Sequence, residues 1–280
     1  MGIVVSTARA SALSSADQSN NPFVAWNNLG ATATLGGTAV VTGGEAANAV
    51  TGSTYDKWRP DVTTTTATLT FDFGSAINIS FAAIAAHNTS TYGASVRVQR
   101  STDGSSWADA GAGIVTPATN APIAWRMATT GNDARYWRFY WTGLTAGDDL
   151  AVGISFIGDD LVIPRRLYQG FAPVLTDTEV QLQSNVSIGA HLLGSSVISR
   201  GSRLSAEITH VAATFIRSAT WLAFQAAFGE GKGFFFAWRP TKYVDDLHYC
   251  ARDGDVIRPA NSGPRDLMSI GFSARVYQNG

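Results

Sequence analysis

Charged residues, cysteine and long apolar runs are all scarce in this chain of 280 residues. Only 15% of the residues are charged, against roughly 25% in an average soluble domain. Twenty basic and 21 acidic residues give a net charge of −1. A protein without a basic excess is not expected to be a general binder of nucleic acid, or to attach electrostatically to an anionic membrane.

The single cysteine, Cys250, excludes an internal disulfide and is typical of a protein that folds in a reducing cytoplasm. We interpret it as a small core residue. No apolar run approaches 18 residues, so we expect no transmembrane helix and no membrane insertion. The N-terminal stretch lacks the basic segment and long apolar core of a signal peptide.

Catalytic and metal-binding motifs are absent from the sequence. There is no HExxH, CxxC, GxSxG, Walker loop or strand-linked GxGxxG. The histidines lack metal-ligand spacing; they are His87, His191, His210 and His248. We therefore predict no catalytic residue, no metal site, no cofactor and no enzymatic activity, although sequence does not test a calcium ion held by loop carbonyls.

Three aspartate doublets are the only paired carboxylates that stand out. Adjacent aspartates do not face each other across a substrate, as glycoside hydrolysis requires. We interpret all three as solvated turn residues, and nominate none of them for a hydrolase; the doublets are Asp148-Asp149, Asp159-Asp160 and Asp245-Asp246.

The first half of the chain is rich in threonine, valine, glycine and aromatic residues, which favour β-strands. Leu69, Phe71 and Phe73 alternate onto one face of a strand. Residues Ile77–His87 form a nearly continuous apolar run, which predicts a strand buried on both faces. Residues Ala134–Trp141 are aromatic on both faces and predict a central strand or a contact surface.

The stretch Ser95–Trp107 predicts a β-hairpin. Val96 and Val98 point to one face of its first strand. Asp103-Gly104 supplies the turn, because glycine accepts a positive φ and aspartate bonds to nearby backbone. We expect Trp107 to return its ring to the core.

The segment Leu161–Gly170, with Pro164 and two arginines, predicts a boundary between domains at 1–162 and 163–280. In the second part, Ser218 is a candidate N-cap of a helix. Trp221, Phe224 and Phe228 share one face of that helix, and Gly229 is expected to end it in the left-handed conformation. Strands flank the helix, so we predict an all-β protein: a jelly-roll β-sandwich, then a small β-sandwich with one flanking helix.

The order LTFDFG, AAIAAHNTS, VRVQRSTDGSSW, ARYWRFYW and VGISFIG over about residues 20–160 resembles the discoidin (coagulation factor 5/8 type C) module. This resemblance implies a galactose-binding-like β-sandwich jelly roll. Such modules bind sugars, lipids or proteins through variable loops, so the fold alone does not give the ligand.

The segment SATWLAFQAAFGEGKGFFFAWRPTKYVDDLHYC resembles distal or minor tail proteins of long-tailed bacteriophages and gene transfer agents, over about residues 165–280. The resemblance implies a ring of copies of the chain, with a hexamer as one option. It also implies tail-tube and hub proteins as partners, and a location in the virion tail after assembly in the cytoplasm of the bacterial host.

Two clusters are candidate contact sites. For the first cluster, one interpretation is a sugar site in which Trp58 stacks on the sugar while Asp56 and Arg59 bond its hydroxyls. In the alternative interpretation, Trp58 fills the bottom of the jelly roll and Arg59 pairs with a carboxylate. The second cluster is a candidate grip on a neighbouring subunit, and is too small and isolated for nucleic acid; it contains Trp238, Arg239, Lys242 and Tyr243.

The leading hypothesis from the sequence is a structural component of a phage-like tail tip. Its C-terminal domain would form a ring and its discoidin-like module would be displayed outside, with a cell-surface glycan as an optional ligand. The alternative is a stand-alone carbohydrate-binding or adhesion protein.

Overall fold

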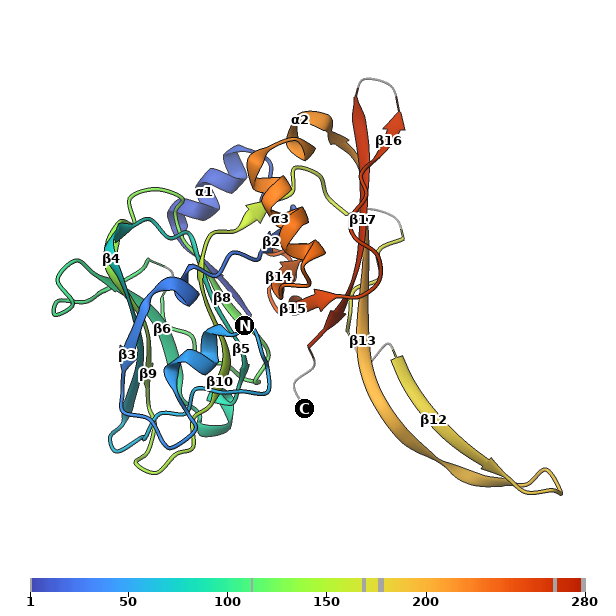
Figure 1. Ribbon diagram of the computed structural model, residues 1–280, viewed down its shortest axis with the longest axis horizontal. Helices are drawn as coiled ribbons and strands as arrows, with labels where there is room; N and C mark the ends of the chain where they lie inside the picture. The colour runs from blue at the N-terminus through green and yellow to red at the C-terminus, as the bar shows by residue number, and fades with distance from the viewer. Residues whose placement is uncertain (1, 112, 168–169, 176–178, 264–265, 278–280) are drawn as a thin grey trace.

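Three β-sheets are stacked as layers in the computed structural model, which describes residues 2–111, 113–167, 170–175, 179–263 and 266–277 (Figure 1). The five-stranded sheet has the order β3 (Thr34–Gly37), β4 (Thr66–Ile77), β9 (Ala134–Thr142), β6 (Ser95–Ser101), β7 (Ala108–Asp109). The four-stranded sheet has the order β1 (Ile3–Val5), β8 (Ile123–Arg126), β5 (Phe81–His87), β10 (Val152–Gly158).

The third sheet runs from β11 (Leu161–Val162) through β2 (Phe23–Ala25), β14 (Phe234–Ala237), β15 (Leu247–Arg252), β17 (Leu267–Val276) and β13 (Leu192–Ala212) to β12 (Glu179–Val186), with β16 (Ala260–Gly263) paired to β17. The α-helices are α1 (Thr7–Ser15), α2 (Ala213–Ile216) and α3 (Ala219–Gly229), and short 3-10 helices are η1 (Leu29–Thr32), η2 (Ala46–Val50) and η3 (Thr89–Tyr92). The all-β prediction is confirmed. No helix in the described part of the chain is both long and apolar enough to cross a membrane.

Large aromatic side chains fill the space between the five-stranded and four-stranded sheets. Trp58, Trp141 and Phe139 are buried there with Trp125 from the opposite sheet. The predicted alternation is confirmed for Leu69 and Phe71, which are fully buried in this core. The first half of the chain is therefore a β-sandwich with its own aromatic core.

The middle layer is buried on both faces, as the apolar run predicted. In β5, Ala82 and Ile84 face the aromatic core, while Phe81 and the alternate alanines face the third sheet. Strand β14 continues this pattern: Phe235 packs towards β5, whereas Phe234 and Phe236 pack towards α3. Consecutive phenylalanines thus join two cores through one strand.

Strands from both sides of the predicted boundary at 162/163 belong to the third sheet. Strand β2 pairs with β14, and β11 pairs with β2. The two predicted parts therefore share a sheet as well as the core between Phe81, Phe156 and Phe235.

Helix α3 begins where the sequence predicted: the Ser218 side chain accepts a hydrogen bond from the Trp221 backbone N–H at 3.3 Å. Its end was predicted wrongly. Gly229 is still helical, and Gly231, with φ of 78°, is the left-handed residue that follows the helix. Trp221, Phe224 and Phe228 are buried against the third sheet as expected.

Three local features differ from the sequence predictions. The run Ile77–His87 is divided, because Ile77 ends β4 and β5 begins at Phe81. Helix α1 was not foreseen; the Ser6 side chain caps it. Trp107 is only half-buried, because its ring packs against the Arg138 side chain and not in the core.

A long two-stranded arm extends from the third sheet (Figure 1). It consists of β12 paired with the first part of β13, which is 21 residues long and continues into the sheet. Every residue of β12 is exposed, as is β13 up to Arg200. The sequence did not predict this arm; we define it as residues 179–201.

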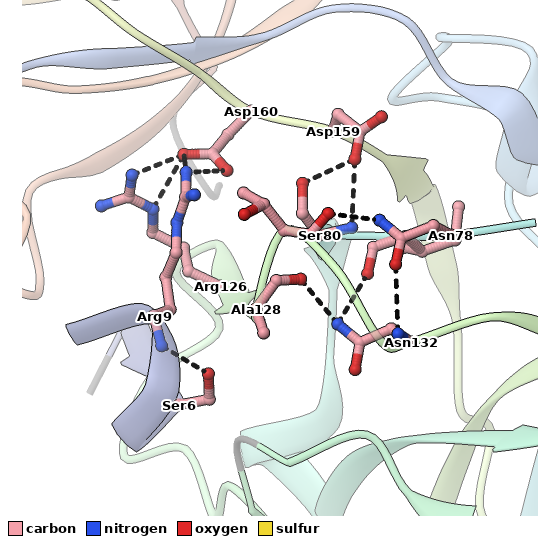
Figure 2. Close-up of polar contacts among 11 residues, drawn as sticks. Ser6, Arg9, Asn78, Ser80, Arg126, Ala128, Asn132, Asp159 and Asp160 are labelled. Atoms are coloured by element: carbon pink, nitrogen blue, oxygen red, sulfur yellow. Dashed lines mark hydrogen bonds and ion pairs between the residues drawn. The ribbon is translucent and has the colours of Figure 1, made fainter. Parts of the chain in front are cut away.

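The carboxylate of Asp160 joins the layers through two arginines (Figure 2). Arg9 Nη2 in α1 donates to Asp160 Oδ1 at 2.9 Å, and Arg126 Nε in β8 donates to Asp160 Oδ2 at 3.0 Å. The Asp160 and Arg126 side chains are 0% exposed. The Arg126 guanidinium also lies over the Phe23 ring of β2, 4.4 Å from its centroid. The prediction that Asp160 is a solvated turn residue is therefore wrong.

Replacing this carboxylate should destabilise the protein strongly. Asp160→Asn leaves two nearly buried guanidiniums without their countercharge, a change that costs roughly 3–5 kcal/mol in buried ion pairs. Asp149→Asn is the matched control, since its partner Arg59 is exposed (side-chain exposures 44% and 57%) and exposed pairs are worth about 0–1 kcal/mol. Urea denaturation measures both; equal losses of unfolding free energy would contradict the assigned role of Asp160.

Candidate ligand groove

A groove of about 740 Å³ lies where loops meet at one end of the jelly roll. One wall comes from residues 43–59, which include η2, and the other from the residues that follow β5 and precede β10. The lining residues are mostly polar; they are Gly43, Asn48, Thr54, Tyr55, Asp56, Lys57, Arg59, Asn88, Asp149 and Ala151.

Backbone bonds hold the groove loop onto the sandwich. The Trp58 N–H donates to the Val152 carbonyl at 2.9 Å, and the Val152 N–H donates back at 3.0 Å. Next to this bridge, Asn88 Nδ2 donates to the Asp149 carbonyl at 2.8 Å and the Ala151 N–H donates to Asn88 Oδ1 at 2.7 Å. Both walls are therefore pinned to the ends of core strands.

The Trp58 side chain is a packing residue. It is 1% exposed, and its ring centroid lies 5.2 Å from that of Trp141. A sugar cannot stack on a ring that is inside the core, so the structure favours the packing alternative for Trp58. Arg59 likewise pairs with a carboxylate, donating from Nη2 to Asp149 Oδ1 at 2.8 Å and Oδ2 at 2.9 Å.

Tyr55 is the aromatic residue that the groove exposes. The residue is 91% exposed, so its ring and its hydroxyl are both accessible to a ligand. Ser53 Oγ accepts hydrogen bonds from the backbone N–H groups of Tyr55 and Asp56, at 3.2 and 3.3 Å, and fixes this turn. The sequence predicted the stacking role for Trp58, whereas the aromatic ring that the structure exposes at the groove is that of Tyr55.

The groove is lined by equal numbers of acidic and basic side chains. Asp56 and Asp149 oppose Lys57 and Arg59, all four of which line it. It therefore offers hydrogen-bond donors and acceptors without a net field. Such a lining suits a neutral, hydroxyl-rich ligand better than a polyanion.

His87 is the last residue of β5, next to the groove residue Asn88, and is buried in its neutral form. Its Nε2 is 3.0 Å from the Ala121 carbonyl and its Nδ1 accepts the Thr89 N–H at 3.3 Å. Burial lowers the pKa of His87 from 6.5 to about 4. Burial also lowers the pKa of His248.

The folded protein should lose stability as the pH falls from 6.5 towards 4. In this window the unfolded chain binds a proton at residue 87 and the folded chain does not, so the free energy of unfolding decreases, by up to about 3 kcal/mol for His87. Urea titrations from pH 7 to 4 measure the slope. His87→Gln should reduce it, whereas the exposed His191→Gln should not; an unchanged slope in His87→Gln would contradict this account.

The second predicted cluster is a closely packed turn between β14 and β15. The Trp238 ring stacks on Tyr243, with centroids 5.1 Å apart, and its Nε1 donates to Asp246 Oδ2 at 2.8 Å. Arg239 lies over Trp238 and Lys242 lies over Tyr243. A subunit contact at these four residues stays a prediction.

Cys250 and the possible metal-binding side chains were the remaining groups to place. Cys250 is 1% exposed, and burial raises the pKa of its thiol, as expected for a core residue. Within the described residues, no group of three or more His, Cys, Asp or Glu side chains is placed to hold a metal ion.

No protein-family model matches the chain, and no curated protein sequence matches it. Among solved structures, chitosan-binding module 1 of a chitosanase/glucanase from Paenibacillus sp. IK-5 is similar, with 17% identity and a TM-score of 0.40 over 47% of this chain and 98% of the module. A pectin-binding carbohydrate-binding module has 13% identity and a TM-score of 0.35 over 49% of this chain and 91% of its own. A GH29 fucosidase from Ruminococcus gnavus has 15% identity and a TM-score of 0.39 over 48% of this chain and 27% of the enzyme.

Proposed function

We propose that the protein binds a neutral carbohydrate in the groove beside Tyr55, as a non-catalytic binding protein. The observation that carries this proposal is the exposure of Tyr55 beside a polar groove with balanced charges. An aromatic ring packs against the apolar C–H face of a sugar, while its hydroxyl can share the sugar's hydrogen bonds. Asp56 and Lys57 supply further acceptors and donors.

Removing the exposed ring should weaken glycan binding without unfolding the protein. Tyr55→Ala is expected to lower affinity about tenfold, equivalent to roughly 1.4 kcal/mol, with no change in Tm. A glycan array identifies the best neutral ligand for wild type, and isothermal titration calorimetry with that glycan compares the variants. Leu222→Ala, at an exposed site on α3, is the control and should bind as wild type does.

Trp58→Ala separates packing from recognition. Because Trp58 is buried, its truncation should reduce the free energy of unfolding by roughly 3–5 kcal/mol. Unchanged stability together with lost binding in Trp58→Ala would return the stacking role to Trp58. Undiminished binding in Tyr55→Ala would reject the groove as the glycan site.

A second candidate function is assembly, and the arm of residues 179–201 is the observation that favours it. In the register of the arm, Leu182 pairs with Val197 and Val186 pairs with Leu192, on the same face as Val180. This face also carries Arg200, the partner of Val180, and the Ser184–Ser195 pair. The other face carries Gln181, Gln183 and Asn185, whose partners are Ser199, Ser196 and Gly194. An isolated two-stranded ribbon is at best marginally stable in water, so an exposed ribbon that carries apolar cross-strand pairs supports the proposal that a partner covers it.

We propose a second copy of the chain, in a closed ring, as this partner. The finer form of the proposal is a subunit of a phage-like tail tip, next to tail-tube and hub proteins in the virion tail. Closed rings form when a surface on one subunit meets a different surface on the next. A protruding arm gives each subunit one such surface.

A charge on the apolar face of the arm should prevent assembly. Leu182→Lys is expected to convert the oligomer to a monomer, whereas Gln183→Lys, on the opposite face one residue away, should leave it intact. Size-exclusion chromatography with light scattering measures mass, and electron microscopy shows whether rings form. A wild-type monomer at all concentrations would reject this function.

A further inference from the structure

The outer face of the five-stranded sheet carries an arrangement of arginines and aromatic rings that neither proposed function uses. The Arg138 guanidinium lies 4.0 Å from the centroid of the Trp107 ring and 4.9 Å from that of Tyr140. Arg97 approaches the same Tyr140 ring at 5.7 Å. We call this set, with Gln99 and Asp109, the arginine face.

Arg138 is held firmly but without a carboxylate of its own. Its Nε and Nη2 donate to Gln99 Oε1 at 2.9 and 2.7 Å, and Gln99 Nε2 in turn donates to Asp109 Oδ1 at 2.9 Å. The neutral amide thus stands between the guanidinium and the aspartate. Partial burial lowers the pKa of Arg138. Among the described residues, no acidic group pairs directly with Arg138.

Arg97 adds a second positive charge. Its contact with Asp109 is long, at 3.5 Å, and its buried Nε has no hydrogen-bond partner among the described residues. Asp109 is therefore the one carboxylate shared, directly or through Gln99, by two guanidiniums. The neighbouring Asp72–Arg135 pair is bidentate and cancels its own charge. The arginine face keeps an excess of positive charge in a chain whose net charge is −1.

The surface beside the arginines carries small and hydroxyl-bearing residues. Thr68 pairs with Tyr140 and Thr70 pairs with Arg138 in the sheet register. Gly36 pairs with Thr70, and the space where its Cβ would lie is open. Small side chains thus form a strip along which an extended ligand can lie in reach of the guanidiniums.

We propose that the arginine face binds an acidic polysaccharide whose carboxylates pair with Arg138 and Arg97. A guanidinium that is fixed in position and lacks a counterion is suited to bidentate recognition of a carboxylate. Cationic groups already occupy the faces of the Trp107 and Tyr140 rings, which disfavours stacking of nucleic-acid bases there. Binding of a peptide by strand addition would need a free sheet edge, whereas this face is a hydroxyl-lined surface. Arginine clusters also bind acidic peptides, so tighter binding of a poly-glutamate peptide than of oligogalacturonate would overturn the proposal.

Calorimetry with an oligogalacturonate of defined length tests this proposal, and the methyl-esterified form of the same oligosaccharide is the neutral ligand control. Wild type should bind the free acid at least tenfold more tightly than the ester, and binding should weaken as salt rises. Arg138→Gln should lower affinity for the free acid about tenfold or more. Arg217→Gln removes the same charge from an exposed site elsewhere and should bind as wild type does.

Two further variants test the shape of the Arg138 side chain and the contribution of the second arginine. Arg138→Lys keeps the charge but loses the planar fork, so it should recover only part of the affinity. Arg97→Gln tests the second guanidinium, and replaces Arg138→Gln if that variant does not fold. Equal affinity for acid and ester, or unchanged affinity in folded Arg138→Gln and Arg97→Gln, would overturn the proposal. So would tighter binding of single-stranded DNA than of oligogalacturonate.

The proposals for the groove and for the arginine face can be rejected independently of each other. Tyr55→Ala should leave oligogalacturonate binding unchanged, and Arg138→Gln should leave neutral-glycan binding unchanged. Loss of acid binding in Tyr55→Ala, with Arg138→Gln unaffected, would place the acidic ligand in the groove and reject the arginine face.

Discussion

Two guanidiniums share one buried carboxylate at the point where the layers of this protein meet. Asp160 lies in the link between β10 and β11, Arg126 ends β8 and Arg9 belongs to α1. Because a charge withdrawn from water must be compensated, these elements are held in one arrangement. The apolar contacts of Phe81, Phe235 and their neighbours are non-directional, whereas the ion network allows a narrow geometry. It therefore fixes how the jelly roll sits on the third sheet.

Local patterns in the sequence were sufficient to predict most strands of the jelly roll, the cap of α3 and the double-sided burial of β5. These features depend on side-chain period and on neighbours close in the chain. The role of Asp160 was not predictable in this way, because an aspartate doublet after a strand looks like a turn. Its partners lie 34 and 151 positions away in sequence. Burial of a charge is decided by such distant partners.

In the candidate site, too, some features could be predicted from the local sequence, whereas others depend on residues far away in the chain. The turn-rich segment around Trp58 was recognisable, and so was the chance that Arg59 pairs with a carboxylate. Which aromatic ring faces solvent depended on the backbone bridge from Trp58 to Val152, which no local pattern specifies. Trp107 shows the converse: the hairpin was predictable, but its ring packs outward because Arg138 on another strand offers a stacking partner.

The length of β13 has a mechanical consequence. The same strand that forms half of the arm continues through the third sheet, paired with β17 from Ser202 to Ala212. A force applied along the arm would load these inter-strand hydrogen bonds in shear, so that many must break together instead of opening one after another. The arm is thus anchored in the third sheet and can transmit tension into the body of the protein before its strands separate.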